Sequence, residues 1–176
     1  MKINGVWAVV LVSVTWVASA EVYLIDSPPF QSVWGEYTTD DQIFGTMVTN
    51  QAVQPNAGLV DILPVLDSYN FSDGVQSFTE NNSEPIAMLI EVNGQGELVG
   101  SYVAIWKTPI TTQENGLVEG MDIYISTDQW QISGFKDGIC SENLGPGGQC
   151  SSALFGGTNA GLYEYFDFIF GHGFDF

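Results

Sequence analysis

The apolar positions of this chain recur with a period of two in short runs, and turn-forming residues separate the runs. The clearest pattern spans residues 85–107, where the runs Ile86–Val92 and Leu98–Trp106 flank the segment NGQG at 93–96. An Asn-Gly pair between two such runs is a strong hairpin signal, because both central residues of a type I′ turn need a positive φ. The sequence therefore predicts a β-hairpin with Asn93 and Gly94 at its turn.

The two predicted strands of this hairpin present contrasting faces. A loop of even length places an almost wholly aliphatic set on one face, which we expect to be the core face: Ile86, Met88, Ile90, Val92, Val99, Ser101, Val103 and Ile105. The opposite face mixes small, aromatic and acidic residues, among them Glu91, Tyr102 and Trp106. A three-residue loop would exchange the faces of the second strand, because side chains alternate along a strand.

Other short runs of the same kind predict further strands. They are Glu21–Ile25, Ser32–Thr38, Ile43–Thr49, Leu59–Leu66, Val75–Thr79, Leu117–Thr127, Trp130–Ile132 and Leu162–Phe170. The segments 67–74 and 133–161 are rich in turn residues and are predicted to be mostly loop. No window has the apolar spacing of an amphipathic helix. About eight to ten short strands predict an antiparallel β-sandwich or jelly roll, formed as one domain by residues 21–176.

The first twenty residues have the pattern of a secretory signal peptide. Lys2 provides a charged start, Val6–Val17 is an apolar segment, and Ala18-Ser19-Ala20 matches a cleavage site. The alternative is an N-terminal membrane anchor, but the apolar segment is shorter than the ~20 residues that a spanning helix needs. We therefore expect a secreted or periplasmic protein whose mature chain begins at Glu21.

The balance of charges narrows the range of partners. The chain has 21 acidic and 3 basic residues and a net charge of −18, and loss of the signal peptide would leave Lys107 and Lys136 as its cations. So acidic a surface repels phosphate backbones and anionic headgroups. We therefore expect neither nucleic acid nor an anionic membrane surface as a partner.

The chain has two cysteines, Cys140 and Cys150, which enclose a glycine-rich segment. An even pair in an exported chain predicts a disulfide. A metal site or a catalytic thiol is the alternative, but the chain has a single histidine, His172, and no CxxC motif.

The candidates for catalysis are few. His172 lies close to the C-terminus, and no G-x-S-x-G motif accompanies it. Carboxylate pairs suited to a glycosidase, such as Asp122 with Asp128 or Glu36 with Asp40, are not selected by any spacing. We therefore expect a protein without enzymatic activity and without a cofactor.

Two kinds of ligand site remain as alternatives. Aromatic side chains beside carboxylates can hold sugars by stacking, and the candidates are Trp34, Tyr102, Trp106 and Trp130. The segment 67–74 offers Asp67, Asn70 and Asp73 as oxygen ligands for a structural calcium ion. Its spacing differs from that of an EF-hand loop, and a solvated Asx turn is the competing interpretation.

The C-terminus supports a further alternative. Aromatic residues alternate up to the last position, at Phe168, Phe170, His172, Phe174 and Phe176. This pattern is typical of the closing strand of a small outer-membrane β-barrel. The competing interpretation is an aromatic edge strand that packs on the core or meets a partner.

The segment GEYTTDDQIFGTM at 35–47 resembles an opening motif of exported bacterial proteins of the PEP-CTERM sorting type, and Ser72-Asp73-Gly74 would supply their Asp-Gly turn. The resemblance implies an exported β-domain associated with extracellular matrix material. The family's C-terminal Pro-Glu-Pro signal, apolar helix and basic tail do not occur in this sequence. Anchoring by that route is therefore not expected.

Taken together, these patterns predict an exported, acidic, non-enzymatic β-domain with a structural or interaction role in the bacterial envelope or extracellular matrix. Its expected partners are a polysaccharide or other envelope and matrix proteins. A carbohydrate- or calcium-linked binding module is the first alternative, and the small outer-membrane barrel is the second.

Overall fold

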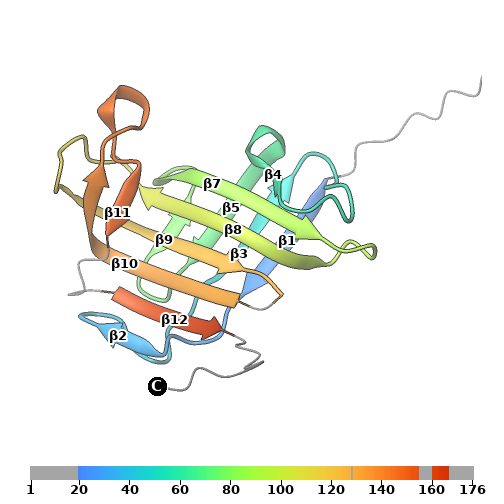
Figure 1. The fold of residues 1–176 in the computed structure, drawn as a ribbon, viewed down its shortest axis with the longest axis horizontal. Coiled ribbons are helices and arrows are strands. Elements are labelled where there is room, and N and C mark those ends of the chain that lie inside the picture. Colours follow the sequence, from blue (N-terminus) through green and yellow to red (C-terminus); the bar gives the residue numbers. More distant parts are fainter. Residues whose placement is uncertain (1–19, 128, 155–159, 167–176) are drawn as a thin grey trace, which may run out of the picture.

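The computed structural model describes residues 20–127, 129–154 and 160–166, which form two antiparallel sheets packed face to face (Figure 1). The smaller sheet has the order β1-β3-β5-β6, with bounds Glu21–Asp26, Phe44–Thr49, Leu66–Ser72 and Ser77–Thr79. The larger sheet has eight strands, seven of them in the order β2-β12-β10-β9-β8-β7-β4, and β11 pairs with β10 off this path. The predicted antiparallel β-sandwich is confirmed.

The larger sheet contains the chain's longest strands. Its bounds are β2 Ser32–Trp34, β4 Val60–Asp61, β7 Ser83–Val92, β8 Leu98–Lys107, β9 Leu117–Ile125, β10 Gln129–Glu142, β11 Ser152–Leu154 and β12 Ala160–Phe166. Two short 3-10 turns, η1 at Leu63–Val65 and η2 at Pro146–Gly148, complete the described elements. The described chain has no helix with the length and apolar character that crossing a lipid bilayer requires.

The main core lies between the two sheets. The larger sheet contributes fully buried side chains such as Met88, Val103 and Ile123, and the smaller sheet contributes Met47 and Phe71. In the predicted strand Leu117–Thr127, Met121 and Ile123 are fully buried and Ile125 packs against the same cluster, so its alternating apolar side chains face the core.

The hairpin β7–β8 exists, but the predicted type I′ turn is wrong. The Asn93 N–H donates to the Glu97 carbonyl at 2.9 Å, and only Gly96 of the four turn residues has a positive φ, of 82°. The Asn93 side chain accepts hydrogen bonds from the Gln95 and Glu97 N–H groups, so this residue caps the turn instead of occupying its centre. The result is a three-residue loop with a left-handed glycine.

The predicted core face of the hairpin is nevertheless largely correct. The odd loop would exchange the faces of β8, but a bulge beside the Glu91–Gly100 pair adds one residue and restores the alternation. Met88, Ile90 and Val103 are therefore buried between the sheets. Ile86 is the exception, because a second bulge turns it toward a separate cluster on the outer side.

Two predicted loops contain strands. Asp67–Ser72 belongs to β5, where pairing with β3 buries Tyr69 and Phe71, and β10 runs as far as Glu142 through a segment that we predicted to be loop. Glycines mask the strand pattern of β10, and Gly134 is required because a Cβ there would lie 2.7 Å from the Asp73 carboxylate. The aromatic C-terminus that suggested a barrel strand lies beyond Phe166, outside the described residues.

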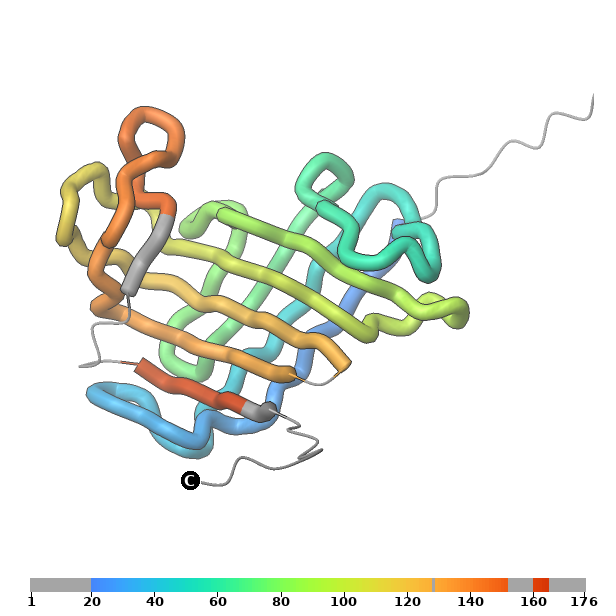
Figure 2. The backbone as a smooth tube through the Cα atoms, in the orientation of Figure 1, coloured from blue at the N-terminus to red at the C-terminus, as the bar shows by residue number. Residues whose placement is uncertain are grey.

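Cys140 and Cys150 form the predicted disulfide, with Cα atoms 5.7 Å apart. Around it a second cluster packs on the outer side of the larger sheet, and its members are Trp106, Ile110, Val118, Phe135, Cys140, Cys150, Ala160 and the partly buried Ile86. The Cys150 N–H donates to the Thr111 carbonyl at 2.8 Å, which ties the disulfide loop to the 108–116 loop. Figure 2 shows both loops at the same end of the sheet.

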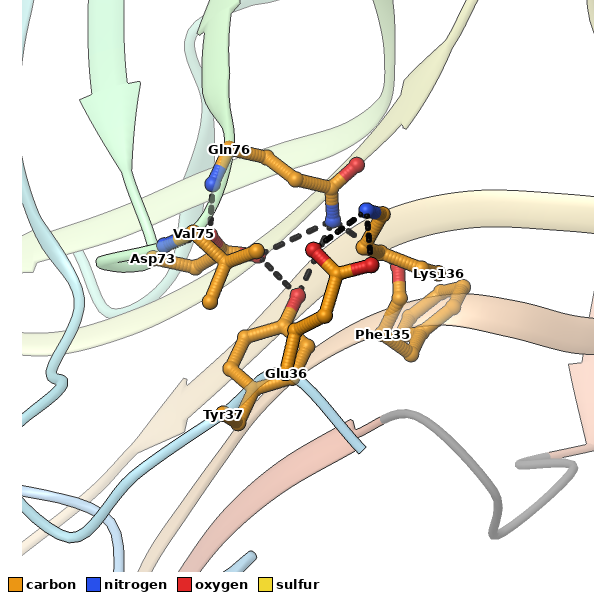
Figure 3. Close-up of polar contacts among 7 residues, drawn as sticks. All are labelled: Glu36, Tyr37, Asp73, Val75, Gln76, Phe135 and Lys136. Carbon is orange, nitrogen blue, oxygen red and sulfur yellow. Dashed lines mark hydrogen bonds and ion pairs between the residues drawn. The ribbon is translucent and has the colours of Figure 1, made fainter. Parts of the chain in front are cut away.

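A polar network joins the β5–β6 turn to β10 (Figure 3). Asp73 is fully buried and accepts hydrogen bonds from the Tyr37 hydroxyl at 2.5 Å, from the Val75 and Gln76 N–H groups at 3.0 and 2.6 Å, and from the Gln76 side chain at 3.1 Å. The Gln76 amide also donates to the Phe135 carbonyl at 3.1 Å. Burial raises the pKa of Asp73, and these hydrogen bonds oppose the shift.

Removing the Tyr37 hydroxyl should weaken the fold. Tyr37→Phe leaves the buried Asp73 short of its closest donor, so we expect a loss of about 1–3 kcal/mol in the free energy of unfolding. Urea denaturation at neutral pH measures it. The control is Tyr124→Phe, which removes an exposed hydroxyl and should cost less than about 0.5 kcal/mol. Equal losses in the two variants would contradict the importance of the network.

Removing the disulfide should lower the melting temperature of the protein. Replacing Cys140 and Cys150 together by alanine frees a loop of about eleven residues, which in the chain-entropy model costs about 2–3 kcal/mol. Thermal unfolding of the oxidised protein, the reduced protein and the double variant measures this loss. We expect the reduced protein and the variant to melt together, and an unchanged melting temperature would contradict the prediction.

Candidate functional site

The outer face of the larger sheet is the most distinctive surface of the described chain. Because paired residues on adjacent strands share a face, the register aligns their outward side chains in rows. One row runs through Leu89, Tyr102, Tyr124, Gln131 and Glu164, and the next runs through Ala87, Ala104, Asp122, Ser133 and Leu162. The disulfide end of this face is covered by the second cluster, whereas Tyr102 and Tyr124 remain 41% and 36% exposed.

Four residues of this face form what we call the outer-face site: Tyr102, Trp106, Asp122 and Tyr124. Tyr102 and Trp106 come from β8 and the other two from β9, so adjacent strands place all four side chains on one surface. Asp122 lies directly opposite Ala104, a small residue. The two tyrosines face each other across the strand pair.

Trp106 lies flat against the sheet. A Cβ at Gly120, its partner on β9, would come within 2.6 Å of the indole Cδ1 and 3.0 Å of the Phe135 ring. The absence of a side chain at Gly120 therefore lets the indole lie on the backbone, where Trp106 is only 4% exposed. The ring forms a boundary between the outer-face site and the second cluster.

Asp122 is an unusual carboxyl for an outer face. Burial raises its pKa from 3.8 to about 6, and the nearby indole N–H of Trp106 opposes this shift. The two groups do not meet in a hydrogen bond of normal geometry, since the buried Trp106 Nε1 has no partner. Burial, and then the charge of Asp122, raise the pKa of the Tyr102 hydroxyl.

The burial of the Asp122 carboxyl bears on what this face can bind. A carboxylate that is desolvated without protein donors costs stability, and such groups gather at binding and catalytic sites. Beside it, the indole N–H is a buried donor without an acceptor. The outer-face site therefore offers a carboxylate acceptor, flanked by two exposed aromatic rings, to a molecule that lies on the sheet.

The four predicted stacking residues do not form one platform. Tyr102 and Trp106 belong to the outer-face site, but Trp106 is buried, and Trp130 packs against the main core. Trp34 is 45% exposed on the edge strand β2, four strand spacings from Trp106 and so about 19 Å away. Tyr124 was not among the predicted residues, although its alternation with Met121 and Ile123 placed it on a polar face.

The three predicted calcium ligands are not brought together. Asp67 and Asn70 are exposed on β5, whereas Asp73 is buried with its oxygens bonded to Tyr37, Val75 and Gln76. Six residues of extended strand separate Asp67 from Asp73 by about 20 Å. Within the described residues, no group of three or more His, Cys, Asp or Glu is placed to hold a metal ion.

The candidate catalytic groups are also dispersed. Glu36 forms an ion pair with Lys136 at 2.8 Å. Asp128 and His172 lie outside the described residues. Two clefts of about 210 and 270 Å³ border the disulfide loop, the first lined by residues such as Ile86, Ile110 and Pro146 and the second by residues such as Glu114 and Asn143.

Asp122→Asn should change how stability depends on pH. The folded-state pKa of about 6 lies above that of an unfolded aspartate, so the folded protein binds more protons between about pH 4 and 6 and loses stability as the pH rises through this window. Asparagine keeps the shape and does not ionise. The variant should therefore match the wild type near pH 4 and gain about 1–3 kcal/mol relative to it above about pH 6.

Urea denaturation at several pH values measures this gain. Asp67→Asn, which removes an exposed carboxyl from the smaller sheet, is the matched control and should show no comparable gain. Parallel stability curves for the wild type and Asp122→Asn would show that Asp122 is not desolvated in solution.

No protein-family model, no curated protein and no solved structure matches the chain. The outer-face site is therefore judged from the geometry of this chain's own residues.

Proposed function

We propose that this protein is an exported, non-enzymatic interaction domain of the bacterial envelope or extracellular matrix, and that it binds polysaccharide through the outer-face site. The observation that carries the proposal is the open face on which Tyr102 and Tyr124 stand side by side next to the desolvated Asp122.

The chemistry of the face suits a sugar polymer. Exposed aromatic rings pack against the apolar faces of sugar rings, and a carboxylate accepts hydrogen bonds from hydroxyl groups. The row from Leu89 to Glu164 crosses five strands and is about 19 Å long. An extended and shallow face of this kind suits a chain lying across the strands better than a small molecule, which needs an enclosing pocket.

Two further features support the export part of the proposal. The first strand begins at Glu21, directly after the predicted cleavage site. The disulfide between Cys140 and Cys150 is typical of proteins that fold in an oxidising compartment.

A co-sedimentation assay with insoluble envelope and matrix polysaccharides tests the binding. The variant Tyr102→Ala/Tyr124→Ala should lose at least about tenfold in affinity for the polysaccharide that the wild type binds, because stacked aromatic contacts each contribute about 0.5–1.5 kcal/mol beyond their buried area. Far-UV circular dichroism verifies that the variant is folded.

Phe44→Ala is the matched control, since Phe44 is a 49% exposed aromatic residue on the smaller sheet. We expect it to bind like the wild type. If Phe44→Ala loses as much affinity as the tyrosine variant, or if the wild type binds no polysaccharide, the proposal is wrong.

A further inference from the structure

We infer that the ligand of the outer-face site is a polysaccharide that carries free ammonium groups, such as a deacetylated hexosamine polymer. The inference rests on the proposed function and deepens it by naming the ligand class. It follows from the charges of the face, from the half-buried carboxylate of Asp122 and from the exposed rings beside it.

The charges of the outer face have one sign. Asp61, Glu91 and Glu164 lie on the same face as Asp122, two or three strands away from it, and no lysine of the described chain lies among them. Both cations of the predicted mature protein are engaged elsewhere. Lys107 donates to the Ser77 carbonyl and lies 4.7 Å from the centre of the Phe78 ring, and Lys136 pairs with Glu36. A face of this charge attracts cations and repels uronic acids and phosphates.

The local geometry fits an ammonium group. Asp122 is half-buried, and among the described residues the Trp106 indole is the one donor that lowers its pKa, so its carboxylate keeps acceptor capacity for a ligand. An ammonium group brings three N–H donors, and the exposed faces of Tyr102 and Tyr124 add cation–π attraction. A neutral ligand would satisfy the carboxylate with hydroxyl groups only, which form weaker hydrogen bonds than charged donors do.

The exposed rings favour an amino sugar over a simple polyamine. Tyr102 and Tyr124 are 41% and 36% exposed, and such rings pack against the apolar faces of sugar rings. A polyamine offers them flexible methylene groups only. The combination of a carboxylate with two exposed rings therefore matches a sugar that carries an ammonium group.

Isothermal titration with two sugar hexamers tests the inference. The β-1,4-linked hexamer of glucosamine should bind the wild type at least about tenfold more tightly than the N-acetylated hexamer of equal length, because only the former makes a charged hydrogen bond to Asp122. Asp122→Asn should remove that advantage, so that the two hexamers bind within about twofold of each other. Asp67→Asn removes the same charge from the smaller sheet and should retain the advantage.

The pH dependence gives a second readout. On the strands packed beside Asp122, the groups that face it are Tyr102 and Trp106 of β8 and Ser133 of β10, none of which is charged near neutral pH, with Glu91 and Glu164 further along the face. Binding of the glucosamine hexamer should therefore be strongest at about pH 6, because Asp122 is protonated well below its pKa of about 6 and the amino groups of the hexamer lose their protons at higher pH. The Asp122→Asn variant should show a flatter profile.

Four results would overturn the inference. Equal or tighter binding of the acetylated hexamer would do so while leaving polysaccharide binding intact. Equal losses in Asp67→Asn and Asp122→Asn would mean that the whole acidic surface, and not this site, attracts the sugar. Spermine binding as tightly as the glucosamine hexamer would remove the role of the sugar rings. Binding of neither hexamer would refute the ligand class, and co-sedimentation would then decide the proposed function separately.

Discussion

Burial of one face of β7, β8 and β9 against the smaller sheet is the constraint on which the rest of this molecule depends. Because side chains alternate along a strand, the aliphatic residues that fill the core determine which residues point outward. The bulge beside Glu91 preserves this alternation despite the odd turn at Asn93. Tyr102, Asp122 and Tyr124 are thus on the outer face because Val103, Met121 and Ile123 are in the core.

Asp73 and Asp122 show what distinguishes a structural carboxyl from an available one. Both are desolvated, and burial raises the pKa of each. Asp73 has four donors and connects the β5–β6 turn to β10 through Gln76, so its oxygens are fully used within the protein. Asp122 has no comparable set of donors. Its desolvation costs folding energy that packing elsewhere must offset, and this is the pattern expected of a group retained for binding.

The second cluster covers one end of the outer face and so limits the part that is open. The disulfide loop and the 108–116 loop cover one end of the larger sheet, and the flat indole of Trp106 separates the covered part from the open part. The open part carries carboxylates and exposed rings, while Lys107 and Lys136 are held at other places. We propose that shape and charge act together here: the face is long enough for a polymer, and its charge favours a cationic one.

The sequence alone determined the features that depend on local alternation: the β class, the hairpin, the disulfide pair, and the inward and outward sides of β8 and β9. Prediction from the sequence was wrong or incomplete where pairing between distant strands determines the structure. Residues 67–72 resemble a turn until β3 pairs with them, Trp130 faces the core, and the neighbouring strand places Tyr124 beside Tyr102. Local periodicity specifies which residues of one strand share a face, but strand order and register specify which strands meet, and these arise from contacts far apart in the chain.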